Sequence, residues 1–169
     1  MARITLFRHG KAEAPNIEGT DFDRVLTKRG RLNAATMGSF IQRQNMLPDL
    51  VLVSPAARTQ ETYQIASNDW PEIPHQICDT IYDASASSLL MLIAAQSEIA
   101  ENIMIIGHNP GLVVLLNRLV GLQHRDRNLS YFPTSCVADI GFAVDRLAQI
   151  EPDEGVLLSI IRARDLAVI

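Results

Sequence analysis

The chain has 169 residues and a net charge of −4, and 47% of its residues are hydrophobic while 20% are charged. These values are typical of one globular domain with a full core, so we expect a single domain over residues 1–169. They exclude the overall positive field of a nucleic-acid-binding protein, and no apolar run reaches the ~18 residues of a membrane helix, so we expect neither nucleic acid nor membrane as a partner.

The cysteines and the N-terminus predict where the protein works. Cys78 and Cys136 form no C-x-x-C motif, and their surroundings favour free thiols in a reducing compartment. The first residues lack a secretory apolar region of sufficient length. We therefore expect a cytoplasmic protein.

The first half of the chain alternates strand and helix patterns. An apolar run over residues 4–7 predicts a strand that ends at Arg8, His9 and Gly10, and residues 10–26 predict a loop. Helical spacing after Thr27, a favourable N-cap, predicts a helix over residues 28–45. The β-branched run 50–53 predicts a buried strand.

The Ser54-Pro55 pair follows this second strand. It predicts the N-cap and first position of a helix, which places Arg58 at the start of that helix. Residues 76–82 predict a third strand, and a helix is expected from Ser87.

The segment 102–106 is the clearest strand pattern, and it ends at His108. Asn109 and Pro110 predict the N-cap and first position of a helix that contains Leu112, Leu115, Leu116 and Leu119. A polar link over residues 123–130 precedes two expected strands, at 136–144 and 155–161. Because strands alternate with helices up to residue 120, we expect a three-layer α/β/α sandwich with a mainly parallel central sheet.

Polar groups of one chemical kind follow three of these strands: Arg8 and His9, then Ser54 and Arg58, then His108. The carboxyl ends of parallel strands meet at one edge of a sheet, so these side chains are expected to converge. Two guanidiniums there would bind the oxygens of a phosphoryl group, and two imidazoles would supply a nucleophile and a second donor. The helix N-terminus after Asn109 adds positive potential, and Gly10 lets the backbone approach a bound group.

Three motifs together resemble the histidine phosphatase (phosphoglycerate mutase-like) superfamily: Arg8-His9-Gly10, Ser54-Pro55 followed by Arg58-Thr59 and Thr62, and Gly107-His108-Asn109-Pro110-Gly111. Within it the chain is similar to the SixA-type phosphohistidine phosphatases. That similarity rests on the short length and on three segments, which are Asp23-Arg24-Val25-Leu26-Thr27-Lys28-Arg29-Gly30, Ile81-Tyr82-Asp83-Ala84 and Asn109-Pro110-Gly111-Leu112.

The resemblance implies roles for the site residues. His9 would be the phosphorylated nucleophile, Arg8, Arg58 and His108 would complete the phosphate pocket, and no metal or other cofactor would be needed. We add Gly10 and Asn109 as candidate phosphate-binding residues. The four histidines also lack the spacing of a zinc site.

The substrate depends on a general acid. Family members that act on alkyl phosphates carry a Glu after the third strand, within a longer insertion, whereas this chain reads Tyr82-Asp83-Ala84-Ser85 and continues directly into a helix. Asp83 is the candidate acid, and it can equally be a loop carboxylate near a helix N-terminus. The short connection leaves no room for a lid, which favours phosphohistidine in a signalling or phosphotransfer protein as substrate.

Two alternatives stay open, namely a phosphatase or mutase for a small phosphate ester and a phosphate-binding module without turnover. The pair His9 and His108 argues against the module, because binding alone needs no nucleophile.

Several residues have no assigned role at this point. Lys11, Glu13, Asp21 and Arg24 either border the site or are solvated loop charges, and Thr134 and Ser135 either return to the site or are turn residues. His75 and His124 are expected at the surface and Cys136 in the core.

Overall fold

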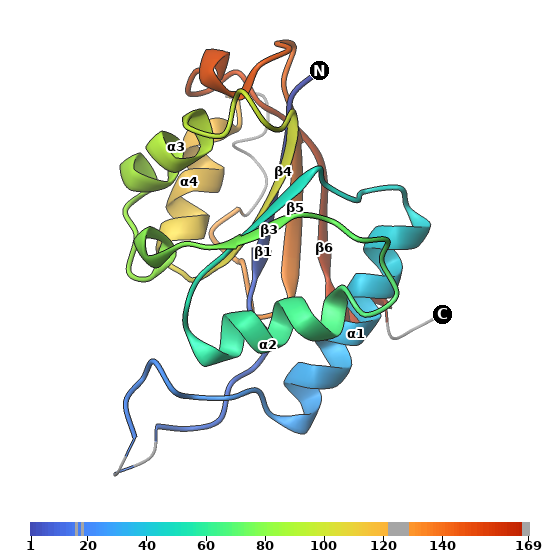
Figure 1. Ribbon diagram of the computed structural model, residues 1–169, viewed down its shortest axis with the longest axis vertical. Helices are drawn as coiled ribbons and strands as arrows, with labels where there is room; N and C mark the ends of the chain where they lie inside the picture. The colour runs from blue at the N-terminus through green and yellow to red at the C-terminus, as the bar shows by residue number, and fades with distance from the viewer. Residues whose placement is uncertain (16, 18, 122–128, 167–169) are drawn as a thin grey trace.

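The computed structural model describes residues 1–15, 17, 19–121 and 129–166, and its centre is one sheet of six strands (Figure 1). The strand order is β3-β2-β4-β1-β5-β6. β3, β2, β4 and β1 run parallel, whereas β5 is antiparallel to β1 and to β6. The strands are β1 Arg3–Arg8, β2 Leu50–Val53, β3 His75–Ile77, β4 Asn102–Gly107, β5 Cys136–Gly141 and β6 Val156–Arg162.

Helices cover both faces of this sheet (Figure 1). Ile4 and Leu6 of β1 belong to a buried cluster with residues of α3 and α4, whereas Phe7 belongs to a second cluster with residues of α1 and α2. The side chains of β1 thus pack against helices on both faces of the sheet, which confirms the expected three-layer α/β/α sandwich. The helices are α1 Lys28–Arg43, α2 Ala57–Ala66, α3 Ala86–Ala94, α4 Gly111–Leu119 and α5 Ala163–Leu166, and the 3₁₀ turns η1 Asp79–Ile81 and η3 Leu147–Gln149 lie between them.

Helix α1 shows how local sequence and packing agree. The Thr27 hydroxyl accepts a hydrogen bond from the Gly30 amide at 3.0 Å, as expected of an N-cap. Gly38 allows α1 to approach α2, since a Cβ at that position would lie 2.0 Å from the Ala66 carbonyl oxygen. The predicted helix over residues 28–45 is confirmed, with its end two residues earlier.

Two predicted helix starts are wrong. α2 begins at Ala57 rather than at Pro55, and α4 begins at Gly111 rather than at Pro110; neither has a side-chain N-cap. Ser54 Oγ lies 2.7 Å from a nitrogen of His108 and accepts a longer hydrogen bond, of 3.5 Å, from the Ala56 amide, while Asn109 Nδ2 donates to the Phe132 carbonyl.

The remaining strands differ from expectation mainly in length. The predicted third strand over residues 76–82 is β3 His75–Ile77 followed by η1, because Ile81 turns into the core. The strand expected over 136–144 is assigned as far as Gly141, although Phe142 and Val144 still exchange backbone hydrogen bonds with Ala2. Most of the link predicted over 123–130, including His124, lies outside the described residues.

In the part of the chain that the structure describes, no helix is long and apolar enough to cross a membrane.

Candidate active site

β1, β2 and β4 end on the same side of the sheet (Figure 1). Arg8 pairs with Gly107, and Val53 pairs with Ile106. The three strands therefore end at nearly the same height along the strand direction, and the residues that follow them lie next to one another. His9, Ser54 and His108 are those residues. The strand ends therefore converge as the motifs predicted.

His9 is held in one neutral form. Its Nδ1 lies 2.7 Å from the Gly10 carbonyl oxygen, and because a carbonyl only accepts, Nδ1 carries the proton. Nε2 therefore keeps its lone pair, which accepts a hydrogen bond of 3.4 Å from Arg58 Nε. Burial, followed by the positive potential of His108, Arg58 and Arg8, outweighs the Gly10 contact and lowers the pKa of His9 to about 3.

His108 has the opposite arrangement of ring nitrogens. Its Nδ1 accepts from Arg58 Nη2 at 3.2 Å, so its Nε2 donates to Ser54 Oγ at 2.7 Å. The two imidazole centroids lie 5.1 Å apart. Burial and then the charge of Arg58 lower the pKa of His108 to about 4, so both rings are neutral near neutral pH.

Arg58 connects the two rings to the loop of residues 10–26. It comes from the first turn of α2 and is only 5% exposed. Besides its contacts to His9 and His108, it donates from Nη1 to the Asp21 carbonyl at 2.6 Å and from Nη2 to Asp21 Oδ2 at 3.0 Å. One guanidinium thus touches both imidazoles and a carboxylate.

Arg8 approaches the site from the end of β1. Its Nη1 donates to the Phe132 carbonyl at 2.9 Å, while its buried Nε has no hydrogen-bond partner among the described residues. Asn109 Nδ2 donates to the same carbonyl at 2.9 Å, and its buried Oδ1 is likewise unpaired in the described part of the chain. Arg8 and Asn109 therefore share one anchor beside the histidines.

Gly10, a predicted phosphate-binding residue, has close contacts within the protein. Its amide donates to Thr62 Oγ1 at 3.0 Å, so this N–H is already bonded within the protein. A Cβ on Gly10 would lie 2.8 Å from the Gly30 carbonyl oxygen, which explains the glycine at this crossing of the loop and α1.

Asp83, the candidate acid, lies apart from these contacts. It is exposed, its φ is 52°, and its side chain makes no hydrogen bond or ion pair with the described residues. Its neighbour Tyr82 enters the site instead, with its ring edge-on to His108 at 5.4 Å and its hydroxyl donating to Asp21 Oδ2 at 2.9 Å.

Asp21, left undecided between the border of the site and a solvated loop charge, borders the site, and Tyr82 is the site residue that sequence reasoning did not select. Burial raises the pKa of Asp21, but the Tyr82 hydrogen bond and the charges of Arg58 and Arg24 outweigh it, so the net pKa lies below its usual range. The acidic residues of the loop 10–26 were the sequence feature that could have indicated Asp21, because a carboxylate is attracted to neighbouring guanidiniums.

The other undecided residues separate into three groups. Arg24 contacts Asp21 and the Glu13 carbonyl at the rim of the loop. The Ser135 amide donates to both the Arg8 and the His9 carbonyl oxygens, so Ser135 supports the end of β1. Lys11 and Thr134 line a separate pocket next to it.

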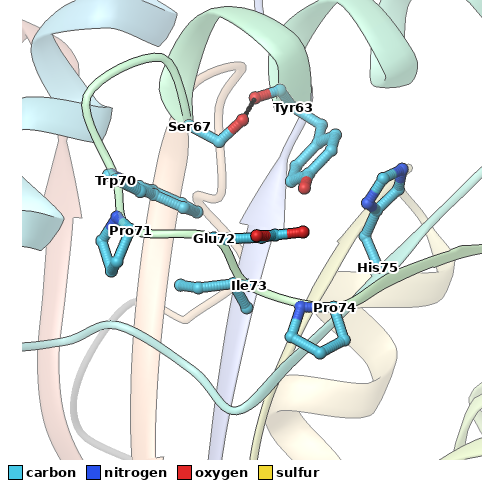
Figure 2. A pocket seen from close by; sticks show the side chains of 8 residues that line it. All are labelled: Tyr63, Ser67, Trp70, Pro71, Glu72, Ile73, Pro74 and His75. Atoms are coloured by element: carbon cyan, nitrogen blue, oxygen red, sulfur yellow. Dashed lines mark hydrogen bonds between the residues drawn. The ribbon is translucent and has the colours of Figure 1, made fainter.

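A pocket of about 660 Å³ lies away from His9 and His108, at the amino-terminal end of β3 and the carboxyl-terminal end of α2. Figure 2 shows the rings of Tyr63 and His75 next to each other on one side of this pocket, with centroids 4.7 Å apart. The histidines of the catalytic edge follow the carboxyl ends of β1 and β4, so this pocket is not part of that site. Within the described residues, no group of three His, Cys, Asp or Glu side chains is arranged to hold a metal ion.

Comparison with known families agrees with this geometry. The model of the histidine phosphatase superfamily (branch 1) matches residues 4–89, which include β1, α1, β2 and α2. The chain belongs to the histidine phosphatase superfamily. It is a mixed α/β phosphatase of the phosphoglycerate mutase-like type.

Solved structures place SixA proteins among the relatives of this phosphatase. A proposed phosphohistidine phosphatase SixA from Agrobacterium tumefaciens is 30% identical, with a TM-score of 0.82 over 95% of this chain and 97% of that one. The protein histidine phosphatase SixA complexed with tungstate is 19% identical, with a TM-score of 0.80 over 97% and 99% of the two chains, a likeness of fold.

A curated sequence relative matches over a shorter stretch. An uncharacterised chloroplastic protein of Arabidopsis thaliana is 37% identical over 60 residues, which is 36% of this chain and 28% of that protein. The match thus spans little more than a quarter of that relative's length.

Proposed function

We propose that this phosphatase removes phosphate from phosphohistidine in a protein, with His9 as the nucleophile. The observation that carries the proposal is the hydrogen bond from His9 Nδ1 to the Gly10 carbonyl, because it leaves a lone pair on Nε2 that faces the guanidinium of Arg58. A lowered pKa keeps that nitrogen unprotonated at neutral pH.

The proposed reaction has two steps. His9 Nε2 attacks phosphorus, the new N–P bond forms as the bond to the leaving imidazole of the substrate breaks, and that imidazole takes a proton from solvent. Water then attacks the phosphoryl group on His9, which gives inorganic phosphate and free His9.

Arg8, Arg58 and His108 are proposed to hold the transferred group. Guanidiniums offer planar pairs of donors to phosphoryl oxygens, and charged donors stabilise the transition state most where water is excluded. Arg58 is buried and Arg8 has an unpaired buried Nε, which support this assignment. A bound dianion would raise the pKa of His108 and make it a charged donor. Asn109 would contribute by fixing the carbonyl of Phe132 that orients Arg8.

The carboxylates near the site favour phosphohistidine over a small alkyl ester. Asp21 has a lowered pKa and is engaged by Arg58 and Tyr82, so it is a poor proton donor, and Asp83 is exposed. An alkoxide leaving group needs a positioned acid, whereas the imidazole of phosphohistidine, with a conjugate-acid pKa of ~6.5, does not. The likeness to SixA proteins supports the same substrate class.

The test combines trapping with a leaving-group series. After rapid quench with a phosphohistidine peptide, intact-mass analysis should show one added phosphoryl group, absent in His9→Ala. Across aryl and alkyl phosphates, kcat/KM should fall steeply as the leaving-group pKa rises, and Asp83→Asn should change this slope little.

Two results would contradict the proposal. A phosphoryl group on another residue would remove His9 from its role. A flat series that becomes steep in Asp83→Asn or Asp21→Asn would identify an acid and favour a small phosphate ester as substrate.

We further propose that residues 1–169 form a single domain, that the reaction needs no metal or cofactor, and that the protein works in the cytoplasm. The last proposal is supported by the free thiols of Cys78 and Cys136.

A further inference from the structure

A second, strongly basic pocket lies next to the catalytic edge. Its volume is about 400 Å³, and four of its lining residues are cations while none of the described lining residues is acidic. The chain as a whole has a net charge of −4, so this concentration of positive charge is local. The cations are Lys11, Arg29, Arg162 and Arg164, and Tyr131 and Thr134 also line the pocket.

Two of the arginines are arranged around Tyr131. The guanidinium carbons of Arg162 and Arg164 lie 5.3 and 5.2 Å from the centre of the Tyr131 ring, and Arg164 Nη1 donates to the Tyr131 hydroxyl at 3.1 Å. Asp165 is the acidic neighbour of both, at 3.7 Å from Arg162 and 3.4 Å from Arg164. Because one carboxylate faces two guanidiniums, the cluster of Arg162, Arg164 and Asp165 keeps a net positive charge.

Backbone contacts join this pocket to the histidine site. Pro133 and Thr134 directly precede Ser135, whose amide bonds to the carbonyl oxygens of Arg8 and His9. Lys11 follows His9 by two residues, and its backbone packs against Gly30, beside Arg29. A ligand in the pocket would therefore lie along the surface that adjoins the phosphoryl site.

We propose that this pocket binds acidic side chains of the phosphoprotein substrate, on the segment that flanks its phosphohistidine. This inference rests on the proposed function and adds a docking surface to it. The cations come from three separate places, namely the loop after β1, the start of α1, and the end of β6 with α5, so they suit several carboxylates along a peptide better than one small anion. Two guanidiniums already lie over the Tyr131 ring, which makes it unsuited to stack a nucleic-acid base.

The experiment uses two phosphohistidine peptides of equal length that differ only in flanking Glu or Gln residues. We compare the wild type, the pocket variant Arg29→Gln/Arg164→Gln, and the control Arg43→Gln/Arg118→Gln, which loses the same charge elsewhere. Arg43 lies at the far end of α1, about 21 Å along the helix from Arg29.

In the wild type and the control, kcat/KM for the acidic peptide should exceed that for the neutral peptide about tenfold at low salt, since each surface charge pair contributes a small factor. In the pocket variant the two peptides should be cleaved equally. High salt should remove the preference from the wild type and from the control. A wild type without preference, or a pocket variant that keeps it, would overturn the docking surface and leave the proposed phosphatase function intact.

A binding measurement separates the two proposals. Fluorescence anisotropy with the unphosphorylated acidic peptide should show binding to the wild type and the control and about tenfold weaker binding to the pocket variant. If neither phosphohistidine peptide is hydrolysed, the proposed function fails while this measurement still decides the docking surface. A single-stranded oligonucleotide of the same charge is the comparison. If it bound as tightly as the acidic peptide and its binding also weakened in the pocket variant, the pocket would be a nucleic-acid site and the proposal would be overturned.

Discussion

The two neutral histidines should make the protein less stable in mild acid. An imidazole in the unfolded chain has a pKa of ~6.5, whereas burial and the neighbouring cations lower the pKa of His9 to about 3 and that of His108 to about 4. Below about pH 6.5 the unfolded chain therefore binds protons that the folded protein does not, so stability falls as the pH falls from there through the folded-state values.

The size of this effect follows from linkage. Between about pH 7.5 and about pH 5, each ring costs about 2 kcal/mol of unfolding free energy, because the unfolded imidazole becomes protonated while the folded one stays neutral. The two together reach about 4 kcal/mol, a large share of the roughly 5–15 kcal/mol of an ordinary domain.

Urea denaturation at the two pH values measures the loss. His9→Asn should reduce the pH-dependent loss by about 2 kcal/mol relative to wild type. His75→Asn, which replaces an exposed imidazole at β3, is the control. If His9→Asn and the wild type lost the same free energy, the imidazole of His9 would not be held neutral in the folded protein, and the argument for its role as a nucleophile would fail with it.

Three further outcomes are expected. Arg58→Ala should lower kcat/KM for p-nitrophenyl phosphate by about 10² to 10³, because one buried guanidinium contacts both imidazoles, and near-wild-type turnover would show that the phosphate is held differently. EDTA should leave activity unchanged, and activity that falls and then returns with a divalent ion would contradict the metal-free proposal. Gly38→Ala should lower the unfolding free energy by about 3 kcal/mol in urea denaturation, since its Cβ would overlap the Ala66 carbonyl, while Ser39→Ala on the same helix should have little effect.

The layers of the fold could be predicted because they depend on local hydrophobic patterns. The runs at residues 4–7, 50–53 and 102–106 became β1, β2 and β4, and the leucines after Gly111 became the buried face of α4. The third strand was predicted too long, because an apolar residue such as Ile81 enters the core from a 3₁₀ turn as readily as from a strand.

The site could be predicted only where it follows the strands. Ser54 and Asn109 are favourable N-cap residues by type, yet their side chains bond to His108 and to Phe132, partners 54 and 23 residues away that no local pattern reveals. The contact between Tyr82 and Asp21 joins positions 61 residues apart, so the local sequence led to the neighbouring Asp83 instead.

The central position of β1 in the sheet determines which parts of the active site can open without unfolding of the domain. β1 is hydrogen-bonded to β4 on one side and to β5 on the other, so releasing the strand before His9 breaks two ladders at once. Amide exchange in this strand should therefore require unfolding of the whole domain, whereas Asp21 contacts Arg58 from a surface loop that local opening can detach. The part of the site that carries His9 therefore opens only when the domain unfolds, whereas the loop that carries Asp21 can open while the fold persists.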